Sequence, residues 1–312
     1  MKKILVAGGS GFIGSHLCEF LLKNDNIVYC VDNLLTSSER NISHLFNNKN
    51  FKFIEHDICD DIDLDINQIY NLACPASPIQ YQKFPFETLN ACIDGSRKLL
   101  DLARRKNAKI LQSSTSEVYG DPMEHPQNES YFGNVNLNGP RSCYDEGKRV
   151  AETIFYNYKI SYGLDIRVAR IFNTYGPRME VNDGRVISNF INQAIHNKNI
   201  TIYGDGSQTR SFCYIDDMIV GLTSLMNSSY QKPMNLGISR ENTILDIAKK
   251  IVKKVGSNSE IIFKNLPEND PLKRQPDISL AREIIDFHPK VSFDIGIENT
   301  ILYFKEIANN EY

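Results

Sequence analysis

The start of the chain carries a strand, a glycine loop and a helix in that order, and this unit constrains the fold most. Ile4–Ala7 is an apolar run typical of a buried parallel strand, and Gly8, Gly11 and Gly14 follow it. Without Cβ atoms, such residues permit a tight turn, the approach of a pyrophosphate and close packing of a helix on the strand. Ser15–Leu22 continues with helical apolar spacing, and the N-terminus of such a helix favours phosphate charge.

A carboxylate at the end of the next predicted strand indicates which dinucleotide binds. Asp32 directly follows the apolar run Ile27–Val31. A carboxylate at this place accepts hydrogen bonds from the adenosine ribose hydroxyls and repels a 2′-phosphate, although a turn cap is the plainer alternative for one such residue. In the context of the whole strand–helix–strand unit, Asp32 predicts NAD rather than NADP as the cofactor.

Alternation of apolar strands and amphipathic helices predicts an α/β fold with a doubly wound parallel Rossmann sheet. The predicted strands of this sheet are Ile4–Ala7, Ile27–Val31, Phe51–Ile54, Ile69–Ala73, Lys109–Ser113 and Ile166–Phe172. Helical spacing covers Ser15–Leu22, Thr88–Lys106, Tyr144–Tyr162 and Val186–His196.

After residue 176 the strands become shorter, which indicates a smaller, partly interleaved α/β domain. Its predicted strands are Ile200–Tyr203, Met234–Leu236 and Glu260–Phe263, and its helices are Thr243–Val255, Ile278–Ile285 and Ile295–Ile307. We therefore expect a cofactor domain over 1–176 with a return segment at about 206–236, and a substrate domain over 177–205 and 237–312. We expect the proline-rich loop Asn265–Asp277 to reach the active site.

Composition excludes several classes of function. The 312 residues carry 35 basic and 38 acidic side chains, a net charge of −3, which gives no sign of a nucleic-acid or membrane partner. No apolar run approaches the roughly 20 residues of a membrane span, and the N-terminus enters a strand directly, so we expect a cytoplasmic protein. The seven cysteines form no Cys-x-x-Cys motif and the six histidines show no metal-ligand spacing, so we expect reduced thiols and no metal.

A tyrosine and a lysine four residues apart are the candidate catalytic pair. Tyr144 and Lys148 share one face of a predicted helix. A phenol has a pKa of about 10, and a nearby ammonium together with a cationic cofactor ring lowers it, which makes the phenolate a base for a sugar hydroxyl. A core-facing tyrosine beside a solvated lysine is the alternative for this pair taken alone. Ser114–Gly120, at the mouth of the fifth predicted strand, adds further polar groups beside it.

Several blocks in order make the whole chain resemble the UDP-glucuronate decarboxylases, a group within the extended short-chain dehydrogenase/reductase family. The blocks are Pro75–Pro78, Ser114–Pro122, Gly139–Arg141, Cys143–Glu152, Arg167–Met179, Asn182–Phe190, Tyr203–Phe212 and Pro271–Ile278. The departures are mild: Ala7 stands where the family usually has Thr, Cys74 where Ser is usual, and Phe132 where Trp is common. They put none of the chemistry in doubt.

The resemblance implies a reaction and assigns roles to residues of the candidate site. Oxidation at C4 of UDP-glucuronate gives a β-keto acid, which loses CO2 because its electrons flow into the ketone as an enolate. Tyr144 would be the base at the C4 hydroxyl, Lys148 would bind the nicotinamide ribose, and Thr115 would stabilise charge at the reacting oxygen. Ser116 and Glu117 follow at the strand mouth. Glu117 would position water or direct the proton at C5, and a capping loop carboxylate is its plainer interpretation.

Arg274 discriminates between substrates, because a guanidinium holds a glucuronate carboxylate through two hydrogen bonds and offers nothing to a neutral glucose. The alternative is a surface arginine in a charged loop. The resemblance implies UDP-sugar contacts by Glu117, Asn173, Arg178, Arg185, Tyr203, Gln208, Arg210 and Arg274, with Arg178 and Arg210 suited to the diphosphate and Tyr203 to uracil. The predicted NAD contacts are Gly8, Gly11, Phe12, Ile13, Gly14, Asp32, Asn33, Thr36, Asp57, Ile58, Leu72, Tyr144 and Lys148.

The sequence thus predicts NAD-dependent decarboxylation of UDP-glucuronate to UDP-xylose, with NAD+ regenerated in each cycle. The alternatives are an open-cycle decarboxylase that releases UDP-4-keto-pentose and NADH, a UDP-sugar 4-epimerase or 4,6-dehydratase, and a regulator that only binds NAD(H) or a nucleotide sugar. An epimerase should not need Glu117 or Arg274, and a dehydratase usually has Asp at position 116. The family also implies a homodimer in which helices around Thr88–Lys106 and Tyr144–Tyr162 pair as a four-helix bundle.

Overall fold

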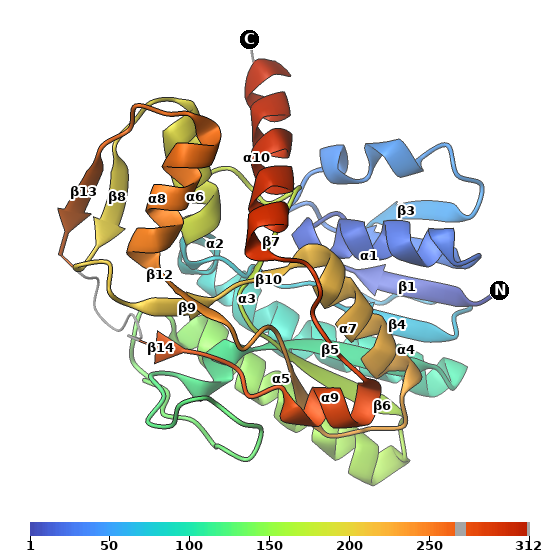
Figure 1. Ribbon diagram of the computed structural model, residues 1–312. Coiled ribbons are helices and arrows are strands. Elements are labelled where there is room, and N and C mark those ends of the chain that lie inside the picture. Colours follow the sequence, from blue (N-terminus) through green and yellow to red (C-terminus); the bar gives the residue numbers. More distant parts are fainter. Residues whose placement is uncertain (266–272, 311–312) are drawn as a thin grey trace.

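A parallel sheet of seven strands forms the centre of the computed structural model, which describes residues 1–265 and 273–310 (Figure 1). Its strand order is β11-β6-β5-β4-β1-β2-β3, and every neighbouring pair is parallel. The strands are β1 (Lys3–Ala7), β2 (Ile27–Asp32), β3 (Phe51–Glu55), β4 (Gln68–Asn71), β5 (Lys109–Thr115), β6 (Ile166–Ile171) and β11 (Pro233–Leu236). The predicted doubly wound fold and its six main strands are confirmed.

Helices cover both faces of this sheet, because its strands are apolar on both sides. Ile4 and Val6 of β1 belong to one buried cluster, whereas Leu5 and Ala7 belong to another on the opposite face. The first face packs against α1 (Phe12–Lys23) and α7 (Ile215–Asn227), and the second against α4 (Ser96–Lys106) and α5 (Ser142–Tyr162). The loops that follow the strands meet at their carboxyl ends, where ligands bind in open α/β sheets.

Three small sheets and three of the four later helices lie on the carboxyl side of the central sheet, whereas the fourth helix, α9 (Ser279–Ile285), packs against α7 and β11 (Figure 1). The small sheets pair β7 (Thr174–Tyr175) with β10 (Cys213–Tyr214), β8 (Ile200–Tyr203) with β13 (Ile261–Lys264), and β9 (Thr209–Ser211) with both β12 (Glu241–Thr243) and β14 (Lys273–Arg274). The other three helices are α6 (Val186–Ile195), α8 (Ile244–Val255) and α10 (Phe293–Asn310). The strand β7 lies in the segment expected to form the cofactor domain, and the other elements lie within the segments expected to form the substrate domain and the return segment.

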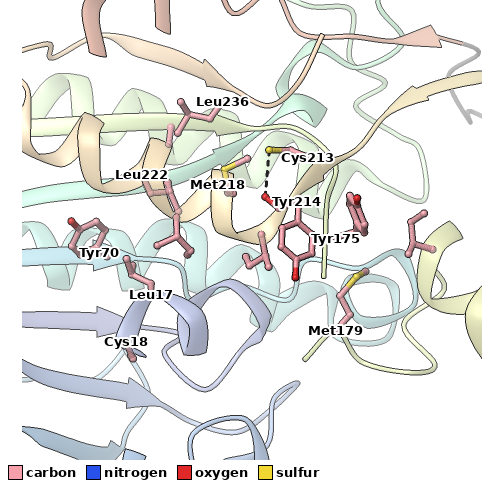
Figure 2. Packing of buried hydrophobic residues seen from close by; sticks show 14 of the residues in the cluster. Leu17, Cys18, Tyr70, Tyr175, Met179, Cys213, Tyr214, Met218, Leu222 and Leu236 are labelled. Atoms are coloured by element: carbon pink, nitrogen blue, oxygen red, sulfur yellow. Dashed lines mark hydrogen bonds between the residues drawn. The ribbon is translucent and has the colours of Figure 1, made fainter. Parts of the chain in front are cut away.

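One buried cluster runs without a break from the central sheet into these later elements. It joins Leu17 of α1 to Met218 and Leu222 of α7 and continues to Tyr175 and Met179 (Figure 2). The cluster also includes residues of α6, α8 and α10. The division into two domains therefore stays a prediction about the chain, while the core itself is shared.

The predicted helix Thr88–Lys106 consists of three connected parts. After α2 (Pro78–Lys83), α3 (Pro85–Asn90) leads into a π-helical turn, Ala91–Gly95, and then into α4. The backbone stays right-handed helical at both junctions. The wider turn places Cys92 against α5, where no side chain intervenes at Gly147.

Within the described ranges, no helix combines the length and the apolar character that crossing a membrane requires.

Candidate active site

A cavity of about 530 Å³ opens at the carboxyl ends of the central strands, and most of the predicted site residues line it. From the cofactor set, Gly8, Gly11, Phe12, Ile13, Gly14, Thr36 and Leu72 line it. From the catalytic set, Thr115, Ser116, Glu117, Tyr144, Lys148 and Arg274 do so. From the substrate set, Asn173, Arg178, Arg185, Tyr203, Gln208 and Arg210 do so. The fold thus brings together residues that are more than 250 positions apart in the chain, from Gly8 to Arg274.

The glycine loop leaves no room for side chains. Gly8 has a φ of +72°, and a Cβ atom there would lie 2.8 Å from backbone atoms of Leu72 and Ala73. A Cβ atom at Gly14 would lie 2.1 Å from the carbonyl oxygen of Gly8. Gly11 is the N-cap of α1 and supplies no side-chain cap, so the first backbone N–H groups of the helix face the cavity edge. This cradle fits a dinucleotide pyrophosphate.

Four predicted cofactor residues lie beside the cavity rather than in its lining. The Asp32 carboxylate accepts hydrogen bonds from the backbone N–H of Ser10 at 3.0 Å and from the Ser37 hydroxyl at 2.8 Å. Ser37 itself lines the cavity. The Asn33 amide donates to Asp57 at 2.8 Å, and Ile58 is buried. Their roles as NAD contacts stay predictions.

Tyr144 and Lys148 project from the first turns of α5 and are both buried. The Lys148 ammonium donates to the carbonyl oxygen of Ser113 at 2.8 Å and lies 5.8 Å from the centre of the Tyr144 ring. Burial raises the pKa of Tyr144 above its usual value, and the Cys74 thiol beside it acts in the same direction. A hydrogen bond with Thr115 acts the other way. With the protein groups alone, the pKa of Tyr144 is therefore raised and not lowered as expected, because desolvation of the phenolate is the largest effect on it.

Glu117 is held by two guanidinium groups. Arg274 donates to both of its carboxylate oxygens, one of them at 2.9 Å, and Arg141 donates to Oε2. Burial opposes ionisation, but Arg274 and Arg141 together lower the pKa of Glu117 below its usual value. Arg274 is 5% exposed, so it is no surface arginine, and its loop does reach the site as expected. Pro271 and Leu272, which precede it in the same motif, lie outside the described residues.

Three further groups near Glu117 were not singled out from the sequence. Arg141 belongs to Gly139–Arg141, one of the blocks that resemble the family, but nothing in the sequence marks it as a partner of the Glu117 carboxylate. Tyr81 stacks on Tyr144 with ring centres 5.0 Å apart and an angle of 8° between planes. Burial, then the charge of Glu117, raises the pKa of Asp145 to about 7. No described group bonds its Oδ1 atom.

The predicted nucleotide-binding residues line the same cavity. Arg210 of β9 stands opposite Arg274 of β14 in register, which places two arginines on adjacent strands. Gln208 donates to the carbonyl oxygen of Tyr203, whose ring is 45% exposed at the end of β8. Asn173 lies between β6 and β7, and its carbonyl accepts from the N–H of Cys213 at 2.9 Å. Positive charge and an accessible aromatic ring therefore lie within one cleft.

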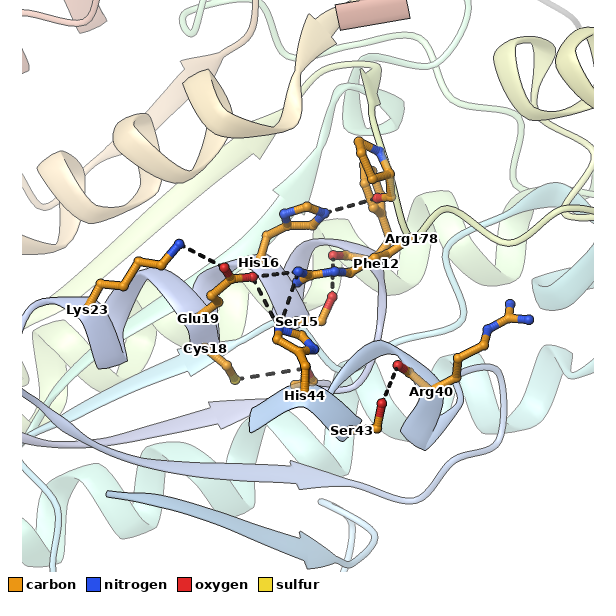
Figure 3. Close-up of polar contacts among 12 residues, drawn as sticks. Phe12, Ser15, His16, Cys18, Glu19, Lys23, Arg40, Ser43, His44 and Arg178 are labelled. Atoms are coloured by element: carbon orange, nitrogen blue, oxygen red, sulfur yellow. Dashed lines mark hydrogen bonds and ion pairs between the residues drawn. The ribbon is translucent and has the colours of Figure 1, made fainter. Parts of the chain in front are cut away.

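Arg178 and Arg185 lie where the glycine loop meets the later part of the chain. Arg178 donates to Glu19 of α1, which also accepts from Lys23, and His44 lies beside this pair (Figure 3). The Arg185 guanidinium is bonded to the buried Asp183 and lies 5.9 Å from the centre of the Phe12 ring. Both arginines thus contact the cofactor side of the cavity as well as lining it.

Within residues 1–265 and 273–310, no three His, Cys, Asp or Glu side chains form a metal-binding group.

Comparison with known proteins gives relatives that match the whole chain. The family model described as GDP-mannose 4,6 dehydratase matches residues 5–300. UDP-glucuronic acid decarboxylase 1 of Xenopus tropicalis is 48% identical over 315 aligned residues, covering 100% of this chain and 75% of the relative. UDP-glucuronic acid decarboxylase 1 of Arabidopsis thaliana is 47% identical, covering 99% of this chain and 71% of the relative.

Solved structures with this fold include sugar-nucleotide epimerases. UDP-glucuronic acid 4-epimerase from Bacillus cereus, in complex with UDP-glucuronic acid and NAD, has a TM-score of 0.88 at 31% identity, with 98% of this chain and 99% of that chain covered. UDP-glucose 4-epimerase from Thermotoga maritima with UDP-glucose has a TM-score of 0.89 at 28% identity, with the same coverage. The chain belongs to the extended short-chain dehydrogenase/reductase family and, within it, to the UDP-glucuronic acid decarboxylases.

Proposed function

We propose that this protein is an NAD-dependent decarboxylase that converts UDP-glucuronate to UDP-xylose and regenerates NAD+ in each cycle. The observation that carries the proposal is the position of Arg274 and Glu117 in the same cavity as Tyr144 and Lys148. A dehydrogenase site with a buried arginine beside it suits a sugar whose C5 bears a carboxylate. Relatives named UDP-glucuronic acid decarboxylase at 47–49% identity support the same reaction.

The residues of the chain divide the chemistry among them. NAD, when bound, accepts the hydride from C4 of the sugar and returns it at the end of the cycle. Tyr144 takes the proton of the C4 hydroxyl, Thr115 donates a hydrogen bond to the oxygen that becomes the ketone, and Lys148 stabilises the phenolate. The 4-keto sugar is a β-keto acid, so its carboxylate leaves as CO2 and the electron pair moves into the C4 carbonyl.

Arg274 orients the carboxylate before it leaves. A guanidinium that pairs through two parallel hydrogen bonds fixes the position of the carboxylate relative to the sugar ring, which holds the breaking C5–C6 bond parallel to the p orbitals of the C4 carbonyl. Glu117, held by Arg141, would lie near C5 of the bound sugar and direct the proton that C5 receives after CO2 has left. Arg210, with Arg178, supplies positive charge for the diphosphate, and Tyr203 contacts uracil.

NAD occupies the glycine cradle in this proposal. The steric limits at Gly8 and Gly14 support a pyrophosphate at the N-terminus of α1, and Asp32, at the end of β2, would accept hydrogen bonds from the adenosine ribose. The NAD named with the Bacillus cereus epimerase supports this cofactor. Asn33, Thr36, Asp57 and Ile58 are assigned to the adenosine end.

One incubation tests the function. The pure protein is mixed with UDP-glucuronate, with and without added NAD+, while the sugar product is followed by NMR and NADH by absorbance. We expect UDP-xylose without net NADH. UDP-4-keto-pentose with stoichiometric NADH would move the protein to the open-cycle decarboxylases, and UDP-galacturonate would make it a 4-epimerase. Unchanged substrate would contradict the role of Arg274.

We further propose a homodimer that forms through α3, α4 and α5, and a cytoplasmic location. Phe86 of α3 is 74% exposed, and Tyr156 and Ile160 of α5 are 60% and 63% exposed. Apolar groups gathered on neighbouring helices support a partner surface, and a second copy with the same helices would complete a four-helix bundle.

A further inference from the structure

Two thiols lie behind the catalytic pair and have no part in the proposed reaction. The Sγ atoms of Cys74 and Cys92 are 3.6 Å apart. Cys74 lies in the loop after β4 and lines the cavity, whereas Cys92 is 1% exposed in the π-helical turn before α4. We propose that Cys74 and Cys92 are a reversible redox pair, in which a peroxide oxidises Cys74, Cys92 closes a disulfide, and turnover at Tyr144 and Lys148 slows.

Cys74 has the environment of the attacking thiol. It is partly exposed and faces the cavity, so a small oxidant reaches it. A hydrogen bond from Cys92 lowers the pKa of Cys74 to about 7, against the effect of burial and with help from the Lys148 ammonium. The thiolate is the reactive form of cysteine. Burial instead raises the pKa of Cys59, a thiol away from the cavity, to about 12.

The oxidation balances with a peroxide as the only co-reactant. The Cys74 thiolate attacks one oxygen of hydrogen peroxide, the O–O bond breaks, and a sulfenic acid and hydroxide form. The Cys92 sulfur then attacks the Cys74 sulfur and displaces the hydroxyl group, which leaves as water with the thiol proton of Cys92. In sum, two thiols and one peroxide give one disulfide and two waters. A dithiol reductant reverses the change by thiol–disulfide exchange.

The third thiol nearby is a poorer partner for Cys74. Cys143 donates to the carbonyl oxygen of Tyr81 at 3.4 Å, which directs it toward α2. Burial raises the pKa of Cys143, and the hydrogen bond with Cys74 raises the pKa of Cys92, so position and not acidity decides between these two thiols. Cys92, in hydrogen-bond contact with Cys74, is therefore the resolving thiol.

Closing the disulfide would displace the helix that carries the catalytic pair. The sulfurs must approach by about 1.5 Å, because a disulfide bond is about 2.05 Å long. Cys92 packs on Gly147, where an added Cβ atom would lie 3.2 Å from Sγ. Gly147 lies on α5 between Tyr144 and Lys148, and the π-helical turn that carries Cys92 interrupts the regular helix on the other side. We expect turnover to fall about tenfold to a hundredfold, because a misplacement of about 1 Å costs up to about a hundredfold in rate.

The experiment exposes the full chain to one equivalent of hydrogen peroxide and maps its peptides by mass spectrometry without reduction. We expect a peptide pair joined through Cys74 and Cys92, two hydrogens lighter than the two peptides with free thiols, together with loss of turnover that dithiothreitol restores. The variants Cys74→Ser and Cys92→Ser are each compared with themselves before and after peroxide. Both should lose the cross-link and the reversible inhibition, while the matched control Cys59→Ser should keep both.

Three results would overturn the proposal. The first is a treated protein with no Cys74–Cys92 peptide, and the second is a cross-link from Cys74 to Cys143 instead. The third is equal, reversible inhibition of Cys92→Ser. The peptide map needs no substrate, so it remains informative if the reaction proves different from the one proposed above. Because the peptide map is made on the unchanged chain, it also tests the proposal when a serine variant does not fold.

Discussion

At the scale of single residues, burial governs the protonation of the proposed base. The Tyr144 hydroxyl is surrounded by Thr115, Cys74 and the ring of Tyr81, and its pKa lies above the usual value in this setting. Lys148 reaches the carbonyl oxygen of Ser113 rather than the phenol oxygen. A positive charge brought by the cofactor ring is therefore what would favour the phenolate.

Replacing Tyr144 by phenylalanine removes the base and keeps the ring that stacks on Tyr81. We expect the Tyr144→Phe variant to lose about 10²- to 10⁴-fold in kcat, the range that one acid–base group supplies, while calorimetry shows unchanged NAD binding. Tyr156→Phe, on the exposed face of the same helix, is the matched control and should keep full activity. Normal turnover by Tyr144→Phe would exclude Tyr144 as the base.

Arg274 tests the recognition of the carboxylate. In Arg274→Lys the charge remains but the planar fork is lost, so we expect binding of UDP-glucuronate to weaken by about 1.5–3 kcal/mol, read as KM in steady-state kinetics. Inhibition by UDP, which has no sugar carboxylate, should be unchanged. Arg282→Lys, an exposed arginine on α9, serves as the control. An equal loss of affinity for UDP would show that Arg274 supports the cleft generally.

Asp145 should make stability depend on pH. Burial and the charge of Glu117 raise its pKa to about 7 in the folded protein, so between about pH 4 and pH 7 the folded state binds more protons than the unfolded state. Stability should therefore fall as pH rises through that window. We expect the free energy of unfolding of Asp145→Asn to exceed that of the wild type by about 2–4 kcal/mol at pH 8 and to be nearly equal to it at pH 4. Calorimetric unfolding at both pH values checks this, and equal curves at pH 8 would contradict it.

At the scale of elements, α1 is tied to the turn after β7 through charge (Figure 3). Glu19 joins Arg178 and Lys23, and His16 donates from Nε2 to the carbonyl oxygen of Pro177 at 3.0 Å. Burial, then the charge of Arg178, lowers the pKa of His16 to about 4, so this imidazole stays neutral over the physiological range. The cluster thus fastens the helix below the pyrophosphate site to a segment of the substrate side.

Removing the charge of Glu19 should loosen this tie. Although burial acts against it, hydrogen bonds from Lys23 and Arg178 lower the pKa of Glu19 to about 2. Its stabilising contribution is complete above the unfolded pKa of about 4.3 and is lost as pH falls toward 2. We expect Glu19→Gln to lower the free energy of unfolding by about 1–2 kcal/mol at pH 7 and by less near pH 3, measured by denaturant titration. Glu39→Gln, which is exposed, should have no effect at either pH.

The sequence predicts elements where the periodic signal is strong. The apolar runs of β1, β2 and β3 start at or within one residue of the predicted positions. The helix α7 is not among the predicted helices, because nine of its thirteen residues are buried and apolar groups surround it on several sides. Two-residue strands such as β7, β10 and β14 carry too few residues for any period. The presence and the pairing of these short strands therefore depend on tertiary contacts that no local sequence pattern encodes.

The candidate site divides in the same way. Gly8, Tyr144 and Lys148 are predictable because each belongs to a short motif with fixed spacing. Arg274 follows only from resemblance. Arg141, the second partner of Glu117, follows from neither source, since salt bridges across 24 and 157 positions leave no local trace in the sequence. The raised pKa of Asp145 is likewise a product of burial, which one sequence does not report.

At the scale of the whole molecule, the exposed apolar face of α3 and α5 predicts association. We expect a solution mass of twice 35.6 kDa by light scattering, because Phe86 and Ile160 would otherwise leave large apolar groups in water. The double variant Phe86→Glu, Ile160→Glu should be monomeric. Leu302→Glu on α10, which is 55% exposed, is the control and should stay dimeric. A wild-type protein of 35.6 kDa at micromolar concentration would remove the dimer.

The ion pair between Glu117 and Arg274 should make the site bind the substrate of the proposed reaction more tightly than its product. An incoming glucuronate must compete with an internal carboxylate for the same guanidinium, and an acid sugar can do so where a neutral one cannot. Once CO2 has left, the sugar has nothing with which to hold Arg274, and Glu117 takes its partner back. Glu117 would thus compete with the bound sugar for Arg274, and after decarboxylation the sugar offers no carboxylate to oppose it. UDP-xylose would therefore leave a site in which the Glu117–Arg274 ion pair has formed again.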